Sequence, residues 1–503
     1  MFENSYLDAF MDHHRFSGLT YDDVSLVTQF ADFEPSQADL GAQLTRGIRL
    51  NIPFVSAAMD TVTEAQMGIA MALAGGIGIV HKNLDAGSQR TELKRIKYYL
   101  NGYLVKARTI TPELTLAEVQ RMKEEKGYHF SSFPVLSEDR RLLGIVTGSQ
   151  FRYASNPETT RVADIMVTNT VTAKPSTTLR EAYEILARHK ISILPVVDAQ
   201  GYFQGLYSFK DVSRIIRQEN PMQSVDDRYS LRAGAAIGPF DHERVECLLE
   251  TRVDVLVVDT AHGHSRPVLD MVKWIKQRYP EQQVIAGNVA AGEGARALAD
   301  AGADGVKVGI GPGSICTTRV VAGVGVPQLT AVYECSKALR GTGVPVIADG
   351  GIRTSGDAAK ALAAGGSTVM MGSIFAGTDE SPGERVLIGG RQYVTYRGMG
   401  SLGAMSRRHG SADRYSQKGI EARKLVPEGI EGLVPYSGPV GSVLHQFTGG
   451  LRASLGYNGT RTIAELQSRA RFVRVTEAGK REAHPHDVEF IKDAPNYRSG
   501  DGE

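Results

Sequence analysis

Short apolar runs bounded by glycine, proline or asparagine alternate with longer helical patterns along most of the chain. The runs are almost continuously apolar, as in residues 255–258, which is typical of parallel strands buried on both faces. The pattern predicts eight strands, near residues 52–57, 76–81, 233–238, 253–259, 283–288, 305–309, 344–348 and 368–372. Helical patterns such as 294–301 and 355–364 fall between them, so we expect an α/β fold of the (β/α)8 TIM-barrel class.

The spacing breaks once, because about 150 residues separate the second and third predicted strands, and segments of that length are rarely structureless. Inside this insert, segments 133–135 and 144–146 recur as 194–196 and 205–207 with one constant offset. The internal repeat predicts two copies of one supersecondary unit.

Each copy is preceded by a helical pattern, at 116–125 and at 179–190, and reads as helix, strand, strand, helix. The paired copies resemble a tandem CBS module, or Bateman domain. The expected domains are the first part of the barrel at 1–100, the insert at 101–219 with copies at about 101–161 and 162–219, and the second part of the barrel at 220–503.

Composition is that of an ordinary globular protein, with 42% hydrophobic and 22% charged residues. The 57 lysine and arginine residues nearly equal the 56 aspartate and glutamate residues, which argues against a nucleic acid or membrane held by bulk charge. No apolar run is long enough to cross a bilayer, and the first residues lack the pattern of an export signal. We therefore expect small-molecule partners.

The chain has three cysteines, Cys247, Cys316 and Cys335, which are too sparse for a disulfide framework or a zinc site and predict a reducing, cytoplasmic setting. Cys316 follows the predicted strand 305–309 on a loop, 309–319, that contains three glycines and a proline. Such a loop brings backbone groups close to a ligand, so we interpret Cys316 as a working nucleophile.

Two other predicted strand ends carry glycine and polar residues. Asp349, Gly350 and Gly351 end the seventh strand, and Gly372 and Ser373 end the eighth. Backbone amides at this place in a TIM barrel are a common phosphate site, whereas an aspartate there can accept hydrogen bonds from ribose hydroxyls. We expect a nucleotide ligand, although the glycines could also serve only to form tight turns.

His262 and His264 follow the fourth predicted strand, close to Asp259. Two imidazoles separated by one residue suggest zinc, but no third ligand has a recognisable spacing. We prefer a ligand-contacting loop at this strand end.

Four segments together carry a specific resemblance: 309–319, 348–351, 396–401 and 19–24. With the paired insert and the segment 424–429, they make almost the whole chain similar to the inosine-5′-monophosphate (IMP) dehydrogenase family. The resemblance implies oxidation of IMP to xanthosine 5′-monophosphate (XMP) with NAD and water, a step of guanine nucleotide biosynthesis.

In this family a cysteine that matches Cys316 adds to C2 of the purine, and the electron-rich carbon then releases a hydride to the nicotinamide. The resulting thioimidate is hydrolysed by water activated on a mobile flap, about 401–438, whose arginine–tyrosine pair matches Arg414 and Tyr415. Arginine is normally protonated, so it can act as a base only in an altered environment or with a proton relay. Thr318 and Glu428 match the family's residues that support this proton transfer. The stretch 406–411 is longer and more basic than the corresponding part of the usual flap. The simplest interpretation of these basic residues is a solvated surface.

The resemblance also assigns binding residues. Those matching the nucleotide site are Met59, Ser314, Asp349, Gly350, Gly351, Gly372, Ser373, Tyr396, Gly398, Met399, Gly400 and Glu428. Those matching the NAD site are Asp259, Gly309, Ile310 and Gly311, and this assignment depends on the resemblance because the chain has no convincing Rossmann fingerprint.

The family further uses a monovalent cation, usually K⁺, held by backbone carbonyls, which suit a weakly hydrated ion. The matching residues are Gly311, Gly313 and Cys316, with Glu482, Ala483 and His484 supplied by a neighbouring subunit. A shared site implies assembly, and the resemblance implies a homotetramer that can pair into an octamer. The plainer interpretation of 482–484 is a polar tail.

The second CBS copy contains Ser208 and Asp211, which match the ribose-contacting pattern of such modules and imply binding of a nucleotide such as ATP or GTP. The first copy has Thr147 and Gln150 at these positions, and glutamine is a poor substitute for aspartate toward a ribose diol. A packed accessory domain without a ligand is the alternative for both copies.

Two other functions remain open. GMP reductase shares the barrel, the cysteine loop and the Asp-Gly-Gly motif but runs an NADPH-dependent reductive deamination. The Arg414–Tyr415 pair favours the dehydrogenase, and the paired insert does so more weakly. The chain could instead be a nucleotide-sensing protein with weak or lost catalysis, against which the intact Cys316 and Thr318 weigh.

Overall fold

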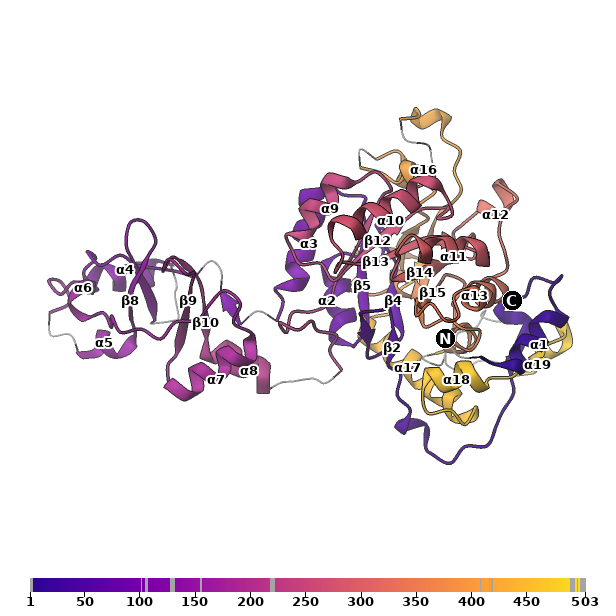
Figure 1. Ribbon diagram of the computed structural model, residues 1–503, viewed down its shortest axis with the longest axis horizontal. Helices are drawn as coiled ribbons and strands as arrows, with labels where there is room; N and C mark the ends of the chain where they lie inside the picture. The colour runs from indigo at the N-terminus through magenta and orange to yellow at the C-terminus, as the bar shows by residue number, and fades with distance from the viewer. Residues whose placement is uncertain are drawn as a thin grey trace. The chain divides into compact units, whose positions relative to one another are not determined.

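The computed structural model describes residues 3–100, 102–104, 107–126, 132–153, 156–217, 222–407, 409–415, 417, 419–488, 494 and 496–497. The chain divides into two compact units (Figure 1). Unit 1 comprises residues 1–97, 222–224 and 231–503, and unit 2 comprises residues 98–221 and 225–230.

Eight parallel strands form a closed barrel in unit 1, in the order β11-β12-β13-β14-β15-β16-β4-β5. They are β4 (Phe54–Ser56), β5 (Ile77–Val80), β11 (Gly234–Ile237), β12 (Val255–Asp259), β13 (Gln283–Val289), β14 (Gly305–Val308), β15 (Val346–Asp349) and β16 (Thr368–Met371). Each lies where the apolar runs predicted a strand, so the TIM-barrel prediction is confirmed. The pairing of β5 with β11 closes the barrel across the long insert in the sequence.

Helices surround these strands (Figure 1). They include α2 (Ala65–Leu73), α3 (Ala86–Lys97), α9 (His242–Leu249), α10 (Arg266–Arg278), α11 (Gly292–Asp300), α13 (Gln328–Ala338), α14 (Ser355–Ala363) and α17 (Val440–Tyr457). The predicted helices 294–301 and 355–364 correspond to α11 and α14. The sequence starts α14 with a capping box, in which Thr354 and Asp357 each accept a hydrogen bond from the other's backbone.

The interior of the barrel is filled with aliphatic side chains rather than open as a pore. Val55, Ile79, Val257, Ile285 and Ile347 belong to one buried cluster contributed by strands around the whole barrel. Because this core is packed, a ligand can enter only at the ends of the strands.

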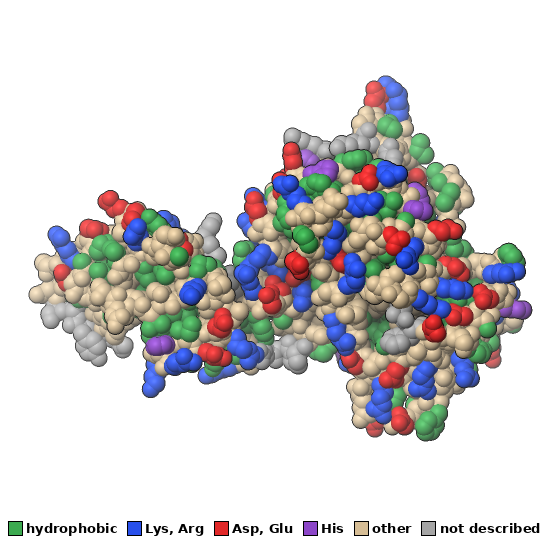
Figure 2. Space-filling view, viewed as in Figure 1, with side chains coloured by type: hydrophobic (Ala, Val, Ile, Leu, Met, Phe, Trp, Pro, Cys, Tyr) green, Lys and Arg blue, Asp and Glu red, His purple; other side chains and the backbone are tan. Residues whose placement is uncertain are grey.

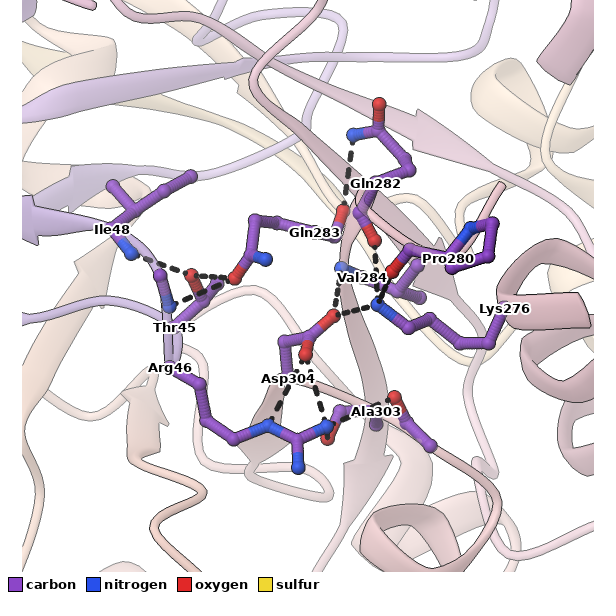
Figure 3. Close-up of polar contacts among 12 residues, drawn as sticks. Thr45, Arg46, Ile48, Lys276, Pro280, Gln282, Gln283, Val284, Ala303 and Asp304 are labelled. Atoms are coloured by element: carbon purple, nitrogen blue, oxygen red, sulfur yellow. Dashed lines mark hydrogen bonds and ion pairs between the residues drawn. The ribbon is translucent and has the colours of Figure 1, made fainter.

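A polar network covers the end of the barrel where the strands begin (Figure 3). Asp304, directly before β14, accepts hydrogen bonds from Arg46 Nε at 3.2 Å, Lys276 Nζ at 3.0 Å and the Val284 amide at 3.0 Å. Beside it, Thr45 donates to Gln283 Oε1 at 2.6 Å. These interactions tie strand starts together, a stabilising role typical of this end of a TIM barrel.

Unit 2 contains the repeated pattern twice. The first copy consists of α4 (Leu116–Lys126), β7 (Phe133–Leu136), β8 (Leu142–Val146) and α5 (Gly148–Tyr153), and the second of α7 (Leu179–His189), β9 (Ile193–Val197), β10 (Phe203–Ser208) and α8 (Phe209–Arg217). Both strand pairs are antiparallel, and each copy has its own buried apolar cluster. Each copy therefore builds a core of its own.

Smaller elements complete both units. They are α1 (Ser5–His13), η1 (Tyr21–Asp23), β1 (Val24–Leu26), η2 (Pro35–Gln37), β2 (Ala42–Gln43), β3 (Arg49–Leu50), β6 (Tyr103–Leu104), α6 (Val162–Ile165), α12 (Thr318–Val321), α15 (Ser373–Ala376), β17 (Arg385–Ile388), β18 (Arg391–Arg397), α16 (Leu402–Met405), η3 (Ala412–Tyr415), η4 (Ala422–Lys424), β19 (Glu431–Pro435), α18 (Ile463–Arg469), β20 (Phe472–Arg474) and α19 (Glu477–Ala483). Across the described residues, no helix is both long and apolar enough to span a membrane. On the face drawn in Figure 2, acidic and basic side chains are interspersed, in keeping with the balanced composition.

Candidate active site

A cavity of about 350 Å³ opens where the barrel strands end. Every residue that the sequence assigned to catalysis, to the nucleotide or to NAD lines it: Met59, Asp259, Gly309, Ile310, Gly311, Ser314, Cys316, Thr318, Asp349, Gly350, Gly351, Gly372, Ser373, Tyr396, Gly398, Met399, Gly400, Arg414, Tyr415 and Glu428. Gly313 lines it as well, whereas Glu482, Ala483 and His484 lie at the end of α19 and are absent from the lining. The fold thus brings together residues that are distant in the sequence.

The loop after β14 positions the Cys316 thiol. Gly309 has φ +150°, and a Cβ there would lie 2.2 Å from the carbonyl oxygen of Asp349, so only glycine allows the loop to leave the strand this close to β15. The Cys316 amide donates to the Gly313 carbonyl at 3.1 Å and closes the turn. The Cys316 sulfur then lies 3.1 Å from Thr318 Oγ1, close enough for the hydroxyl to donate to a thiolate.

A second segment holds this loop in place. The Thr317 amide donates to the Glu428 carbonyl at 2.9 Å, and the Ile430 amide donates to the Ile315 carbonyl at 3.0 Å. The Glu428 amide in turn donates to the Gly400 carbonyl at 2.9 Å. Residues 428–430 therefore form a bridge between the cysteine loop and 398–400, which explains how Glu428 reaches the cavity.

The ends of β15 and β16 form another wall. Gly350 and Gly351 have φ of +91° and +79°, conformations that glycine adopts without strain. At Gly372, a Cβ would lie 2.8 Å from the Tyr396 hydroxyl and 3.0 Å from the Met59 sulfur, so the backbone is closely lined on this side. Burial raises the pKa of Tyr396 and keeps its hydroxyl protonated as a hydrogen-bonding group.

Lys307 was missed by the sequence analysis. Its side chain is 2% exposed, and its ammonium group lies 3.0 Å from Asp259 Oδ1 and 2.7 Å from Asp349 Oδ2, and also donates to Asn288 Oδ1. Asn288 Nδ2 donates to Asp349 Oδ2 at 2.9 Å. One buried cation thereby joins the carboxylate assigned to NAD with the carboxylate assigned to the nucleotide.

Gln328 and Asn288 were missed as well. Gln328 Nε2 donates to the carbonyls of Val308 at 2.8 Å and Asp349 at 3.0 Å, and so braces two strand ends. Neither amide stands out in the sequence. Lys307 does carry a signal, because a lysine inside the otherwise apolar strand 305–308 must find a buried counter-charge.

Arg414, in η3, lies against the end of β12 with its side chain 14% exposed. Its guanidinium forms an ion pair with Asp259, and its carbonyl accepts a hydrogen bond from the Ala261 amide at 3.1 Å. Burial alone would raise the pKa of Asp259, but the charges of Arg414 and Lys307 hold it below its usual value. Burial alone would likewise lower the pKa of Arg414, but the charge of Asp259 raises it, so the guanidinium is protonated in this arrangement.

Tyr415 follows Arg414 and packs against Gly400. A Cβ at Gly400 would lie 2.8 Å from the Tyr415 ring, which leaves no room for any larger residue. Burial raises the pKa of Tyr415 to about 12. Its hydroxyl is therefore a neutral hydrogen-bonding group at physiological pH. Arg408, in the stretch 406–411, lies outside the described residues.

The residues assigned to NAD and three of those assigned to K⁺ can be located on the cavity wall. For NAD, the close-approach glycines Gly309 and Gly311 leave backbone open to the cavity, and Asp259 is an ionised acceptor. Of the residues assigned to K⁺, Gly311, Gly313 and Cys316 lie on the loop that lines the cavity. Among the described residues, no group of three or more His, Cys, Asp and Glu side chains could hold a metal ion.

The two copies of the repeat in unit 2 differ at the positions compared in the sequence. In the first copy, Gln150 Oε1 accepts hydrogen bonds from the Thr147 amide at 2.9 Å and the Thr147 hydroxyl at 2.6 Å, so it caps its own helix. In the second copy, Ser208 ends β10 and Asp211 lies in the first turn of α8, both half-buried. The carboxylate of Asp211 is therefore placed at a strand–helix junction.

A closed eight-stranded barrel, with a thiol-bearing loop and glycine-lined strand ends around a cavity, is the architecture of a (β/α)8-barrel enzyme. A family model described as the IMP dehydrogenase/GMP reductase domain matches residues 18–486. The chain belongs to this family, and it is an oxidoreductase.

Curated relatives agree. An inosine-5′-monophosphate dehydrogenase of Halalkalibacterium halodurans is 50% identical over 95% of this chain and 98% of its own length. One from Aquifex aeolicus is 51% identical over 95% of this chain and 97% of its own length.

A solved structure of a GMP reductase variant from Trypanosoma brucei, in complex with guanosine 5′-monophosphate, is also similar. It has a TM-score of 0.77 and 39% identity, and the match covers 94% of this chain and 98% of that chain. Because a reductase matches almost the whole chain, the inserted unit does not distinguish dehydrogenase from reductase. The insert therefore does not favour a dehydrogenase, and the distinction between dehydrogenase and reductase depends on Arg414 and Tyr415 of the flap.

Proposed function

We propose that the chain oxidises IMP to XMP with NAD and water, through a covalent intermediate on Cys316. The observation that carries this proposal is that Arg414 and Tyr415 line the same cavity as the Cys316 thiol, since the thiol suits the first half-reaction and the pair suits the second. The names of the relatives at about half identity support the same substrate.

In the first half-reaction the Cys316 thiolate forms a bond to C2 of IMP, and the purine accepts the electron pair. C2 then loses its hydrogen as hydride, which leaves a thioimidate between C2 and sulfur. NAD supplies the hydride acceptor and leaves as NADH. Thr318 Oγ1, 3.1 Å from the sulfur, stabilises the thiolate by donating a hydrogen bond.

The substrate is held by the strand ends and loops that line the cavity around the thiol. Asp349 accepts from the ribose hydroxyls, while Lys307 and Asn288 fix its carboxylate. The phosphate is held by backbone amides at 350–351 and 372–373, with Ser314, Ser373 and Tyr396 beside them. Met59 and the stretch 398–400 pack around the base.

In the second half-reaction water adds to C2, the C2–sulfur bond breaks and the thiol leaves, which gives XMP. The water is held between Arg414 and Tyr415. Its proton passes through the Thr318 hydroxyl to the Glu428 carboxylate, because the charge of Asp259 keeps Arg414 protonated where it lies. Arg414 therefore orients the water and stabilises the charge that develops on it.

The two half-reactions use Asp259 in turn. In this structure Arg414 holds its carboxylate, so an NAD that uses Asp259 requires the flap, about 401–438, to move away. Arg414 and its neighbours in η3 would then move between the two half-reactions.

We further propose K⁺ at the carbonyls of Gly311, Gly313 and Cys316, completed by 482–484 of another copy of the chain in a homotetramer or octamer. Exposed apolar side chains beside the cysteine loop, Val320, Val321 and Val324, support assembly on this side.

In unit 2 we propose a tandem CBS module with ATP or GTP at Ser208 and Asp211. The three free thiols support a reducing, cytoplasmic setting.

The test is purified protein with KCl, assayed in parallel for NADH formation from IMP plus NAD and for NADPH consumption with GMP. Stoichiometric NADH and XMP would support the dehydrogenase. NADPH loss with ammonia release would establish the reductase, and silence in both would favour a nucleotide-sensing protein. Cys316→Ala should abolish turnover yet keep ATP binding in unit 2, and retained IMP oxidation in that variant would refute the covalent mechanism.

A further inference from the structure

Lys82, at the end of β5, holds the flap by a contact outside the residues assigned so far. Its side chain is 8% exposed, and its ammonium group contacts both carboxylate oxygens of Asp413, with Oδ1 at 2.6 Å. Asp413 lies in η3 and directly precedes Arg414. The ion pair from Lys82 thus fixes the residue next to Arg414 in the chain.

The barrel leaves space for this pair. At Gly238, directly after β11, a Cβ would lie 2.9 Å from Asp413 Oδ2 and 3.4 Å from Lys82 Nζ. Asp241 Oδ2 also lies 3.1 Å from that position, but it is engaged by the Gly238 amide at 2.8 Å and by Arg244 at 3.3 Å. Asp413 is therefore the carboxylate that contacts Lys82, although a second one is near.

The residues on either side of Lys82 are fixed by partners of their own. His81 Nε2 lies 3.2 Å from Glu64 Oε1, and Asn83 Nδ2 donates to Asp60 Oδ2 at 3.0 Å. Lys82 consequently projects from a rigid strand end, which gives the ammonium group a defined position.

Two ion pairs of opposite polarity join η3 to the barrel. Lys82 of the barrel meets Asp413 of the flap, and Asp259 of the barrel meets Arg414 of the flap. The two pairs involve strands at separate places in the barrel, β5 and β12. Loss of either pair leaves a largely buried charge without its partner, which disfavours the docked flap.

We propose that Lys82 is a positioning residue for hydrolysis: through Asp413 it holds the flap closed and places Arg414 and Tyr415 over the Cys316 intermediate. This inference depends on the proposed function. Lys82 would act only in the second half-reaction, because the first requires the flap to leave Asp259. Substitution of Lys82 should therefore separate NADH formation from turnover.

The test compares Lys82→Gln and Asp413→Asn with the parent chain in pre-steady-state NADH formation. The expected result is an unchanged burst rate constant, a burst amplitude that approaches one NADH per site, and a kcat about 10- to 100-fold lower, because misplacement of about 1 Å has such an effect. The charge-reversed double variant, Lys82→Asp with Asp413→Lys, should recover part of kcat. Gly238→Ala should reproduce the defect with both charges intact.

Lys276→Gln is the matched control. It also removes a partly buried lysine that pairs with an aspartate of the barrel, but at the opposite end of the strands (Figure 3). It should lower Tm while the burst and kcat keep their parental values. A Lys82→Gln variant that retains the parental kcat, or that loses burst rate and kcat in equal proportion, would overturn the proposal.

A second measurement does not depend on the reaction. The Arg414 side chain is 14% exposed and paired with Asp259 while the flap is docked, so trypsin can cleave after Arg414 only when the flap opens. Lys82→Gln and Asp413→Asn should be cleaved about tenfold faster than the parent and Lys276→Gln, since cleavage follows the population of the open form. Equal cleavage rates would refute the proposal that Lys82 and Asp413 hold the flap closed. Absence of NADH from the parent chain would refute only the proposed function.

Discussion

The guanidinium of Arg414 forms an ion pair with the carboxylate of Asp259, and this contact puts the flap on the residue assigned to NAD. Asp259 is also 3.0 Å from Lys307, and although burial opposes it, the charges of Arg414 and Lys307 together hold the pKa of Asp259 below its usual value. The site thus has a fixed barrel carboxylate that can serve two partners in succession. This relationship makes the two half-reactions experimentally separable.

Arg414→Gln should keep the first half-reaction and lose the second. We expect an NADH burst close to one per site and a steady-state rate about 10² to 10³ lower, the range for loss of a group that stabilises charge developing in the transition state. Rapid mixing with IMP and NAD measures both. Arg407→Gln, an exposed arginine of the same flap, should behave as the parent, and a lost burst in Arg414→Gln would contradict the assignment.

Gly400→Ala should displace Tyr415 without removing any polar group. Its Cβ would lie 2.8 Å from the Tyr415 ring, so the ring or the segment 398–400 must shift. We expect kcat to fall about 10-fold to 100-fold. Gly432→Ala is the control, because a Cβ there has no atom within 4 Å. Equal kcat values for the two variants would show that Tyr415 needs no fixed position.

Lys307→Met should destabilise the barrel. Removal of the ammonium group leaves Asp259 and Asp349 as neighbouring carboxylates at a buried position, and loss of one partner of a buried pair costs about 3 to 5 kcal/mol. Denaturant unfolding of the variant measures the loss. The exposed Lys273→Met should stay within about 0.5 kcal/mol of the parent. A similarly small change at Lys307 would mean that the two carboxylates are separately compensated.

Asp8 should contribute a pH-dependent part of stability. Its hydrogen bond from Arg340, stronger than the opposing effect of burial, holds its pKa below the ordinary value of 3.8. A lowered pKa in the folded state adds stability above pH 3.8, and this stability is lost as pH falls through the folded value. The Tm difference between the parent and Asp8→Asn should be constant near neutrality and shrink below pH 3.8. A difference that persists in acid would contradict this origin.

Asp211→Ala should weaken nucleotide binding by unit 2 about 10- to 100-fold, the value of a hydrogen bond to a charged group. Calorimetric titration with ATP and with GTP provides the measurement. Gln150→Ala should have no effect, because Gln150 already caps its own helix. Loss of affinity in Gln150→Ala instead would place the ligand in the first copy.

Local patterns were enough for much of this protein. Continuous apolar runs such as 255–258 identify strands buried on both faces, and eight of them with intervening helices leave few alternatives to a barrel. Cys316 and Asp349 could be recognised because glycine-rich strand ends are where such barrels hold ligands. The cavity residues assigned by resemblance were also brought together, although the resemblance supplied them and not the pattern.

What the sequence determined by itself was the order of strands and helices, the repeat in the insert and the loop that carries the thiol, because each depends on interactions between near neighbours in the chain. Only the tertiary structure decided which charges meet. The ion pairs of the site join residues from separate strands or from the flap. They are the pairs of Lys307 with Asp259, of Asp259 with Arg414 and of Lys82 with Asp413. Such pairs leave no periodicity in the sequence, since each depends on where the closed barrel places the end of every strand.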